Sequence, residues 1–195
     1  MTSERAYQIA KDKFRDNPQR FKHTLGVCET AVCLANKYNL DVEKMKVAAL
    51  FHDYSKYDSI DLQTKYLDDV TIEHFKDTPV MFHALAASQV LKNEFNYEDT
   101  DVLNAINKHV WGASQMSLFD KVLLISDKIE PNRSYDKVDY FRKLAFENID
   151  LAVIEFLKEN VEYNKRKGFN IPSEQIKVID DLEKKHYDPN KQGEF

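Results

Sequence analysis

The chain has 195 residues, 31% of them charged and 43% hydrophobic, with a formal net charge of −5. This is typical of one globular domain with a sizeable core, and the mild acidity argues against broad nucleic-acid binding, which requires a basic surface. The chain has only four glycines, which argues against glycine-rich phosphate loops, and its two cysteines lack a CxxC spacing, which argues against a cysteine-based zinc site. It has no long apolar run and no leader-like N-terminus. We therefore expect a cytoplasmic protein that is not associated with a membrane.

Apolar residues recur every three or four positions through most of the chain, which predicts helices and no strands. The predicted helices span about residues 3–14, 18–38, 42–53, 62–67, 79–95, 99–109, 117–130, 135–148, 150–167 and 173–186. Ser3, Asp41, Ser117 and Ser173 are candidate N-terminal caps for four of these helices. The tail from residue 188 is expected to be frayed. The pattern therefore predicts an all-α fold.

Histidines and aspartates stand on or at the ends of predicted helices, beside apolar faces. In chain order they are His23, His52, Asp53, His83, His109 and Asp127. Imidazole and carboxylate together suit Fe, Mn or Zn, and a helical bundle builds metal sites by aiming such side chains inward. A single histidine of this kind is more often an ordinary core or surface residue, as we expect for His74 and His186. The ordered set makes a metal site the better interpretation.

His52 and Asp53 are adjacent, so on a helix their side chains would diverge by about 100°. Both reach one ion only where the helix ends, and the polar residues that follow predict such an end. Three basic residues, Arg20, Lys56 and Arg133, lie close in sequence to the candidate ligands. A single cation is usually a surface residue, but cations beside a metal are what a polyphosphate requires.

Several motifs resemble one known superfamily. They are Arg20-x-x-His23, Ala48-Ala-Leu-Phe-His52-Asp53-Tyr-Ser-Lys56, Pro79-x-x-x-His83, Ala105-Ile106-x-x-His109, Gly112, Met116-Ser117 and Asp127-Lys128-Ile129-Glu130-Pro131-x-Arg133. With them the chain resembles the HD-domain metal-dependent phosphohydrolases, which are all-α helical bundles. Within that superfamily it is similar to the bacterial symmetrical bis(5′-nucleosyl)-tetraphosphatases, the YqeK-type proteins. The segment from Asp127 to Arg133 is the most discriminating of these motifs.

The resemblance implies one HD-type domain over residues 1–195, with a core at about 18–168 and a C-terminal helix at about 172–186. It implies symmetrical cleavage of diadenosine tetraphosphate to two ADP by metal-bound hydroxide. The implied metal ligands are His23, His52, Asp53 and Asp127. The implied cofactor is a divalent metal, expected to be Fe, with Mn, Co or Zn as alternatives. A homodimer is compatible with the sequence.

The resemblance also implies roles around the metal. Asp53 and Lys56 would be catalytic. The residues expected on the substrate side are Arg20, His23, Lys56, His83, His109, Trp111, Asp127 and Arg133. His83 and His109 could instead hold a second ion, and the sequence leaves both alternatives open. Trp111 could stack on a nucleobase or wall the pocket, or it could simply pack in the core.

Two positions depart from the family pattern. Val110 stands after His109 where the family usually has threonine, so a hydroxyl that could bond phosphate is missing. Ala84 follows His83 where glycine is usual. Three other functions therefore stay open: an HD-type nucleotidase or dNTP phosphohydrolase, a nucleotide-binding regulatory module that turns over poorly, and a structural helical protein. Product analysis, binding without hydrolysis, and metal content respectively would distinguish them.

Overall fold

The computed structural model describes residues 1–187 and shows an all-α protein, as the sequence predicts. These residues form eleven α-helices and one short 3-10 helix, and contain no strand. The elements are α1 (Ser3–Lys13), α2 (Pro18–Lys37), α3 (Val42–Phe51), α4 (Ile60–Thr64), α5 (Asp69–Phe75), η1 (Pro79–Met81), α6 (Phe82–Asn93), α7 (Thr100–Lys108), α8 (Leu118–Ile129), α9 (Val138–Glu147), α10 (Ile149–Arg166) and α11 (Ser173–His186).

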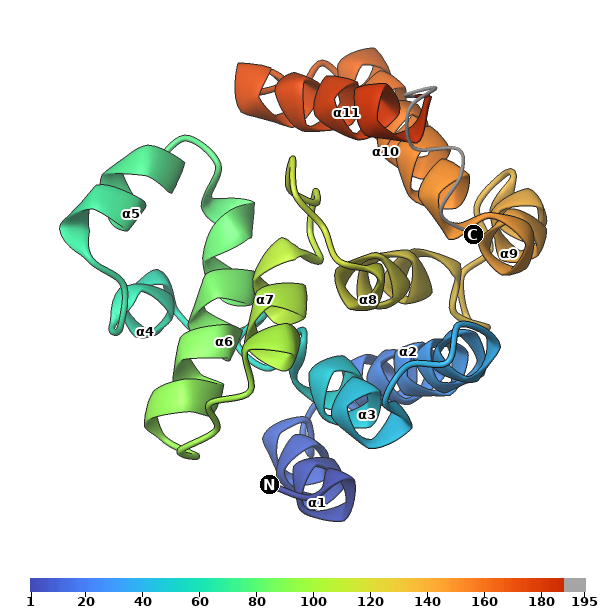
Figure 1. The fold of residues 1–195 in the computed structure, drawn as a ribbon. Coiled ribbons are helices and arrows are strands. Elements are labelled where there is room, and N and C mark those ends of the chain that lie inside the picture. The colour runs from blue at the N-terminus through green and yellow to red at the C-terminus, as the bar shows by residue number, and fades with distance from the viewer. Residues whose placement is uncertain (188–195) are drawn as a thin grey trace.

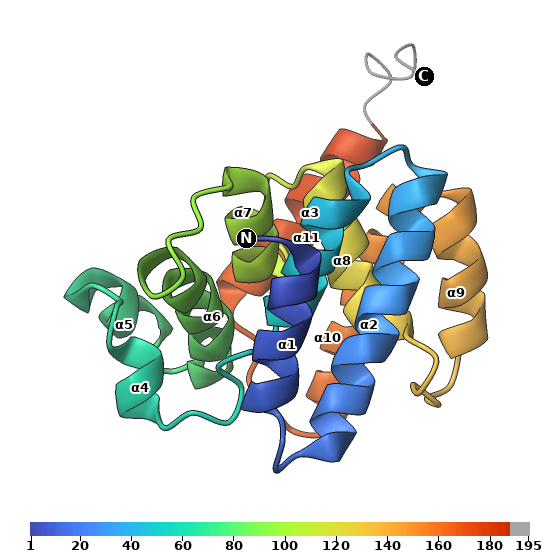
Figure 2. The same ribbon diagram turned by 90° about the horizontal axis from the view of Figure 1, so that it is seen from below.

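Helix α8 lies at the centre of the bundle, where it packs against α2, α7 and α10 (Figure 1). Helix α3 bridges α2 and α7, and α1 covers the outer side of α3 (Figure 2). On one flank α6 packs on α7 and carries α4, while on the other flank α9, α10 and α11 form a C-terminal layer. The ends of α3, α7 and α8 thereby meet the first turns of α2 and α6.

Polar caps fix where the central helices begin. Asn17 caps α2 by accepting from the Arg20 backbone N–H, and Pro18 occupies the first position of that helix. Asp41 caps α3 in the same way. Ser117 and Asp120 form a reciprocal capping box at the start of α8. These local signals set the register of helices that later contribute ligands.

Two predicted caps and one predicted helix start were wrong. Thr2, not Ser3, caps α1, because the Thr2 hydroxyl accepts from the backbone N–H of Arg5. Ser173 is the first residue of α11 and follows Pro172, which makes no side-chain cap. The helix expected to start at Tyr135 begins at Val138.

The segment between α3 and α6 also differs from the prediction. Asp68 caps α5, a helix that the polar composition of residues 54–78 concealed. The helix expected from Pro79 to Phe95 begins as the 3-10 turn η1 and continues as α6 to Asn93. The expectation of a frayed tail from residue 188 falls outside the described residues. No helix within residues 1–187 combines the length and the apolar character that a membrane crossing requires.

Candidate metal centre and its cavity

Six ionisable side chains predicted from the sequence meet inside the bundle. They come from the N-terminal part of α2, the turn after α3, the start of α6, the end of α7 and the end of α8, and every one is buried: His23, His52, Asp53, His83, His109 and Asp127. Helix α3 ends at Phe51, so His52 and Asp53 lie at a helix end, which their adjacency requires if both are to reach one ion. Burying six ionisable side chains lowers the stability of a fold unless the groups are paired or bind an ion.

The first donor set consists of His23, His52, Asp53 and Asp127. His23 Nε2 lies 3.1 Å from Asp127 Oδ1 and 3.7 Å from Asp53 Oδ2, and His52 Nε2 lies 3.5 Å from Asp53 Oδ2. His52 Nε2 and Asp127 Oδ1 are 3.9 Å apart. Ligand atoms about 2.1 Å from a common ion lie roughly 3 to 3.4 Å from one another in octahedral or tetrahedral geometry. The spacing therefore fits a metal ion with only small movements.

The second oxygen of Asp53 faces a different pair of histidines. Asp53 Oδ1 is 3.1 Å from His83 Nε2 and 3.5 Å from His109 Nε2, and the two imidazole nitrogens are 3.3 Å apart. Asp53, His83 and His109 thus form another compact group of donors, all within 4.8 Å of one another. Asp53 lies between the two sets, with one oxygen directed to each.

Three of the imidazole rings are held so that Nε2 faces the centre. His52 Nδ1 donates to the carbonyl oxygen of Ala49 at 2.6 Å, and His109 Nδ1 donates to that of Ile106 at 2.6 Å. His23 Nδ1 lies 3.1 Å from the carboxylate of Glu130. Because each acceptor requires a proton on Nδ1, Nε2 is left with its lone pair, the form that binds metals.

Two of these nitrogens are buried without a hydrogen-bond partner, namely His23 Nε2 and His52 Nε2. Most buried polar atoms in folded proteins have partners, so unpartnered lone pairs that converge on two carboxylates indicate a cation-binding site. The residues present therefore fit a divalent metal. Their nitrogen and oxygen atoms are compatible with Fe, Mn, Co or Zn and do not select among them.

Glu130 is a functional residue that the sequence analysis missed. Its carboxylate is buried and orients His23, and it also accepts from the backbone and side-chain N–H groups of Asn132 at 2.7 and 2.8 Å. The contact depends on Gly26, because a Cβ atom there would lie 2.4 Å from Glu130 Oε2. Glu130 lies in the discriminating segment after Asp127, and that motif was the available signal.

Four cations surround the two aspartates. Arg20 Nη1 lies 2.5 Å from Asp53 Oδ2, and Arg133 Nη2 lies 2.9 Å from Asp127 Oδ1. Lys56 Nζ is 3.2 Å from His83 Nε2 and 3.9 Å from Asp53 Oδ1. The fourth cation was missed by the sequence analysis: Lys128 Nζ lies 2.6 Å from Asp127 Oδ2. Arg20, Lys56 and Arg133 are thus brought together as a basic group.

Burial and charge act in opposite directions on the titrating groups. Burial alone would raise the pKa of Asp53, but His52, His109 and His83 hold it well below its ordinary value. The pKa of Asp127 is likewise well below its ordinary value, because Lys128 and His23 outweigh the effect of burial. Burial lowers the pKa of His109 to about 4. Both carboxylates are therefore ionised and His109 is neutral near pH 7.

These groups open into one cavity of about 730 Å³, here called the histidine cavity. Its lining includes His83, His109, both aspartates and all four cations, together with Val110, Trp111, Asn160, Asn164, Phe169 and Gln175. Trp111 is only 7% exposed, so it is both a core residue and part of the cavity wall. Val110 faces the cavity where a hydroxyl was expected from the family pattern. Ala84 is fully buried in α6 and does not line the cavity.

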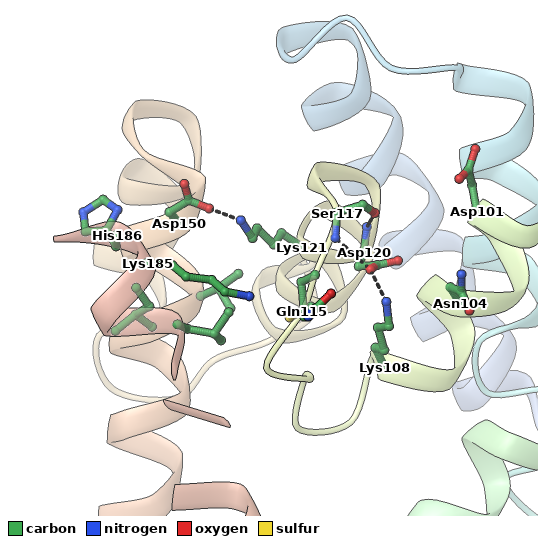
Figure 3. A pocket seen from close by; sticks show the side chains of 14 residues that line it. Asp101, Asn104, Lys108, Gln115, Ser117, Asp120, Lys121, Asp150, Lys185 and His186 are labelled. Carbon is green, nitrogen blue, oxygen red and sulfur yellow. Dashed lines mark hydrogen bonds and ion pairs between the residues drawn. The ribbon is translucent and has the colours of Figure 1, made fainter. Parts of the chain in front are cut away.

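A second hollow of about 550 Å³ lies between α7, α8, α10 and α11, and we call it the lysine cavity (Figure 3). Its lining includes Lys108, Lys121, Lys185, Asp120 and Asp150. The figure shows Lys108 directed at Asp120 and Lys121 directed at Asp150, at 2.7 and 2.5 Å. The predicted site residues do not line this cavity; they line the other one or lie beneath it.

Comparison with known proteins accounts for this arrangement. The HD domain profile matches residues 20–132, more than half of the chain, and that range includes every candidate metal ligand. The chain belongs to the HD domain family. HD domains bind divalent metals, in agreement with the donor groups described above. Of the residues named so far that line the histidine cavity, Arg133, Asn160, Asn164, Phe169 and Gln175 lie beyond the matched range.

Two curated relatives extend the HD domain match. A protein of Halalkalibacterium halodurans is 34% identical over 86% of this chain and 90% of its own length. A protein of Bacillus subtilis is 32% identical over the same shares. Both are named symmetrical bis(5′-nucleosyl)-tetraphosphatase. The resemblance to these HD phosphohydrolases that the sequence motifs predict is thereby confirmed.

A solved HD structure has the same fold. It is described as a predicted HD superfamily hydrolase involved in NAD metabolism from Clostridium acetobutylicum. The two chains superpose with a TM-score of 0.85 at 30% identity, covering 95% of this chain and 98% of the other. The likeness therefore includes α10 and α11, which lie outside the HD domain match.

Proposed function

We propose that this protein is a metal-dependent phosphohydrolase that cleaves diadenosine tetraphosphate symmetrically into two molecules of ADP. The observation that carries the proposal is the shared placement of Asp53 and Asp127. Both carboxylates face histidines whose Nε2 atoms converge, and both contact cations that line the same cavity. The names of the curated relatives support the choice of substrate.

We assign the metal to His23, His52, Asp53 and Asp127. A divalent ion at such a site polarises phosphoryl oxygens and lowers the pKa of bound water towards neutrality. Iron is our first choice, with Mn, Co and Zn as alternatives. Glu130 supports the assignment, because it fixes the orientation of the His23 ring through Nδ1.

The remaining residues of the histidine cavity act on the substrate. Arg20, Lys56, Lys128 and Arg133 offset the charge of the phosphate oxygens and hold the tetraphosphate across the site. Asp53 keeps the water that attacks phosphorus in position. This arrangement places the negative charge that develops during cleavage among the four cations that line the cavity.

We assign His83 and His109 to phosphate or water contacts, and not to a second ion. Lys56 Nζ lies 3.2 Å from His83 Nε2, so a positive charge already occupies the place beside these histidines. His83 Nε2 and His109 Nε2 already have hydrogen-bond partners, whereas His23 Nε2 and His52 Nε2 have none within residues 1–187, which supports a single ion at the first donor set. The pKa of Lys56 is lowered by burial, and it is partly restored by Asp53.

We also propose that the chain works as one HD-type domain, with the C-terminal helix as part of the site. Gln175 of α11 and Phe169 in the loop before it line the histidine cavity together with Arg20 of α2. Residues about 150 positions apart thus enclose one substrate. A protein cut after α8 would lack that wall.

The decisive experiment is anaerobic purification with elemental analysis, followed by product identification on diadenosine tetraphosphate. The proposal expects about one divalent ion per chain and two ADP per substrate consumed. AMP with ATP as products, or release of tripolyphosphate from a nucleoside triphosphate only, would contradict it in favour of another nucleotidase. Tight ADP binding without hydrolysis in Fe, Mn or Co would favour the regulatory alternative.

A further inference from the structure

A third cavity, distinct from the histidine and lysine cavities, adjoins the metal centre, and the proposed function assigns no ligand to it. It measures about 540 Å³, and we call it the aromatic cavity because Tyr135, Phe156 and Tyr163 line it. It shares one wall with the histidine cavity, made of Val110, Lys128, Arg133 and Asn160. The two hollows are therefore neighbours on either side of a short basic wall.

That shared wall is tied directly to the metal ligand Asp127. Lys128 Nζ lies 2.6 Å from Asp127 Oδ2, and Arg133 donates to both the side chain and the carbonyl oxygen of Asp127 at 2.9 and 3.0 Å. Phosphates held at the metal would thus lie against these cations. A chain of phosphates that continues past them leaves the histidine cavity and enters the aromatic one.

The aromatic cavity presents flat, accessible rings. Tyr163 of α10 is 50% exposed and Tyr135, before α9, is 36% exposed. The ring of Tyr135 also packs against the ring of Phe156, with the two centroids 6.3 Å apart. Half-exposed aromatic rings are what a nucleobase stacks on, and stacking is favourable for any base because each has a π-face.

A substrate with two identical halves, cleaved at its centre, must extend to both sides of the metal. The histidine cavity offers Trp111 and Phe169 to one half. Resting on the proposed function, we infer that the aromatic cavity binds the second nucleoside of the dinucleoside tetraphosphate, with Tyr163 as its stacking surface. Asn160, in the shared wall, is placed to contact the sugar or the phosphate beside it.

The test measures binding and not turnover, so it stands apart from the proposed function. The probe is a diadenosine tetraphosphate analogue with a methylene group in place of the central bridging oxygen, titrated by calorimetry into the metal-loaded protein. Tyr163→Ala is expected to weaken its binding about ten-fold, the effect of losing one base stack. Tyr163→Phe keeps the ring and should bind as the wild type does.

Two controls separate stacking from general damage. Inorganic tripolyphosphate carries the charge without a nucleoside, and its affinity should be the same in wild type and Tyr163→Ala. Tyr140→Ala removes another half-exposed tyrosine, one that lies on α9 and lines neither cavity, and should leave both affinities unchanged.

Unchanged affinity of Tyr163→Ala for the analogue would overturn the inference, as would an equal weakening of both probes. Loss of binding in Tyr163→Phe would show that stacking is not the interaction. Failure of the wild type to produce ADP would instead refute the proposed function, while the calorimetric result would still decide whether the aromatic cavity holds a nucleoside.

Discussion

The histidine cavity and the lysine cavity are both lined by aspartates and lysines, and each contains a buried aspartate, yet they differ in how those charges are paired. In the lysine cavity Lys108 faces Asp120 and Lys121 faces Asp150 in separate ion pairs (Figure 3). Of the buried side-chain atoms that line it within residues 1–187, Asp120 Oδ1 alone lacks a partner.

The histidine cavity shows the opposite organisation. Asp53 and Asp127 are each shared by several histidines and by cations, and two imidazole nitrogens converge on them without partners. The presence of aspartates and lysines alone would not have distinguished the two regions. What marks the metal centre is the convergence of unpartnered lone pairs from different helices.

The largest expected difference is between substitutions of Asp53, in the histidine cavity, and Asp120, in the lysine cavity. Asp53→Asn should remove bound metal and lower turnover by about a thousand-fold or more, because the ion contributes several kcal/mol to the barrier reduction. Asp120→Asn should keep metal and activity, with unfolding made easier by about 1–3 kcal/mol through the weakened pair with Lys108. Elemental analysis, kcat and urea denaturation report these quantities. Full activity in Asp53→Asn would refute the metal assignment.

A second comparison concerns the cations. Arg133→Gln should lower kcat/KM by about ten- to a hundred-fold, because it removes charge-assisted hydrogen bonds to phosphate. Lys121→Gln, in the lysine cavity, should change kcat/KM less than two-fold, since that lysine faces Asp150 and no substrate. Steady-state kinetics at saturating metal give both values. Equal losses in the two variants would mean that the charges act through the overall field of the protein.

The third comparison concerns the apolar walls. Trp111→Ala should raise KM several-fold and also destabilise the fold, by about 3–5 kcal/mol, because Trp111 is both cavity wall and core. Leu182→Ala, whose side chain lines the lysine cavity, should lower stability by about 2–5 kcal/mol without a change in KM. Unchanged KM in a folded Trp111→Ala protein would assign the tryptophan to packing alone.

The last expected effect is a gradual one, on the acid stability of the metal-free protein. The unfolded chain takes up a proton on His109 near pH 6.5, whereas folded His109, whose pKa burial lowers to about 4, does not. Its contribution to stability is therefore present above pH 6.5 and lost as the pH falls towards 4, by at most about 1.4 kcal/mol per pH unit. Urea titrations of chelated wild type and His109→Gln between pH 7 and 4 measure it. The wild-type curve should fall more steeply, and parallel curves would contradict the assigned pKa.

The sequence predicted the fold wherever short-range signals act on their own. Pro18 begins α2, and Asp41 and Ser117 cap α3 and α8, as these local signals predict. Helix α5 was not predicted, because its cap, Asp68, is followed by a short and mostly polar segment without a continuous apolar face. The start of α9 was misplaced because Lys137 adopts a left-handed conformation there, with φ of 65°, which its residue type does not announce.

The site was predictable to the extent that its residues belong to motifs. The order of His23, His52, Asp53 and Asp127 indicated a metal, but which oxygen of Asp53 faces which histidine depends on how the helices meet. Lys128 and Glu130 were quoted as parts of a motif without a role. Lys128 lies in the last turn of α8 beside Asp127, and Glu130 reaches His23 because the chain turns towards α2 after Ile129.

Gly26 limits how this protein can be stabilised. Replacing a helical glycine by alanine ordinarily favours the helix by about 1 kcal/mol, and α2 would be an attractive place to do so. Here the added methyl group would overlap the carboxylate that holds His23, so the gain in helix propensity would come with a displaced metal ligand. The close approach of α2 to the Glu130 carboxylate thus leaves room for no side chain at position 26, and Gly26→Ala is expected to weaken metal binding.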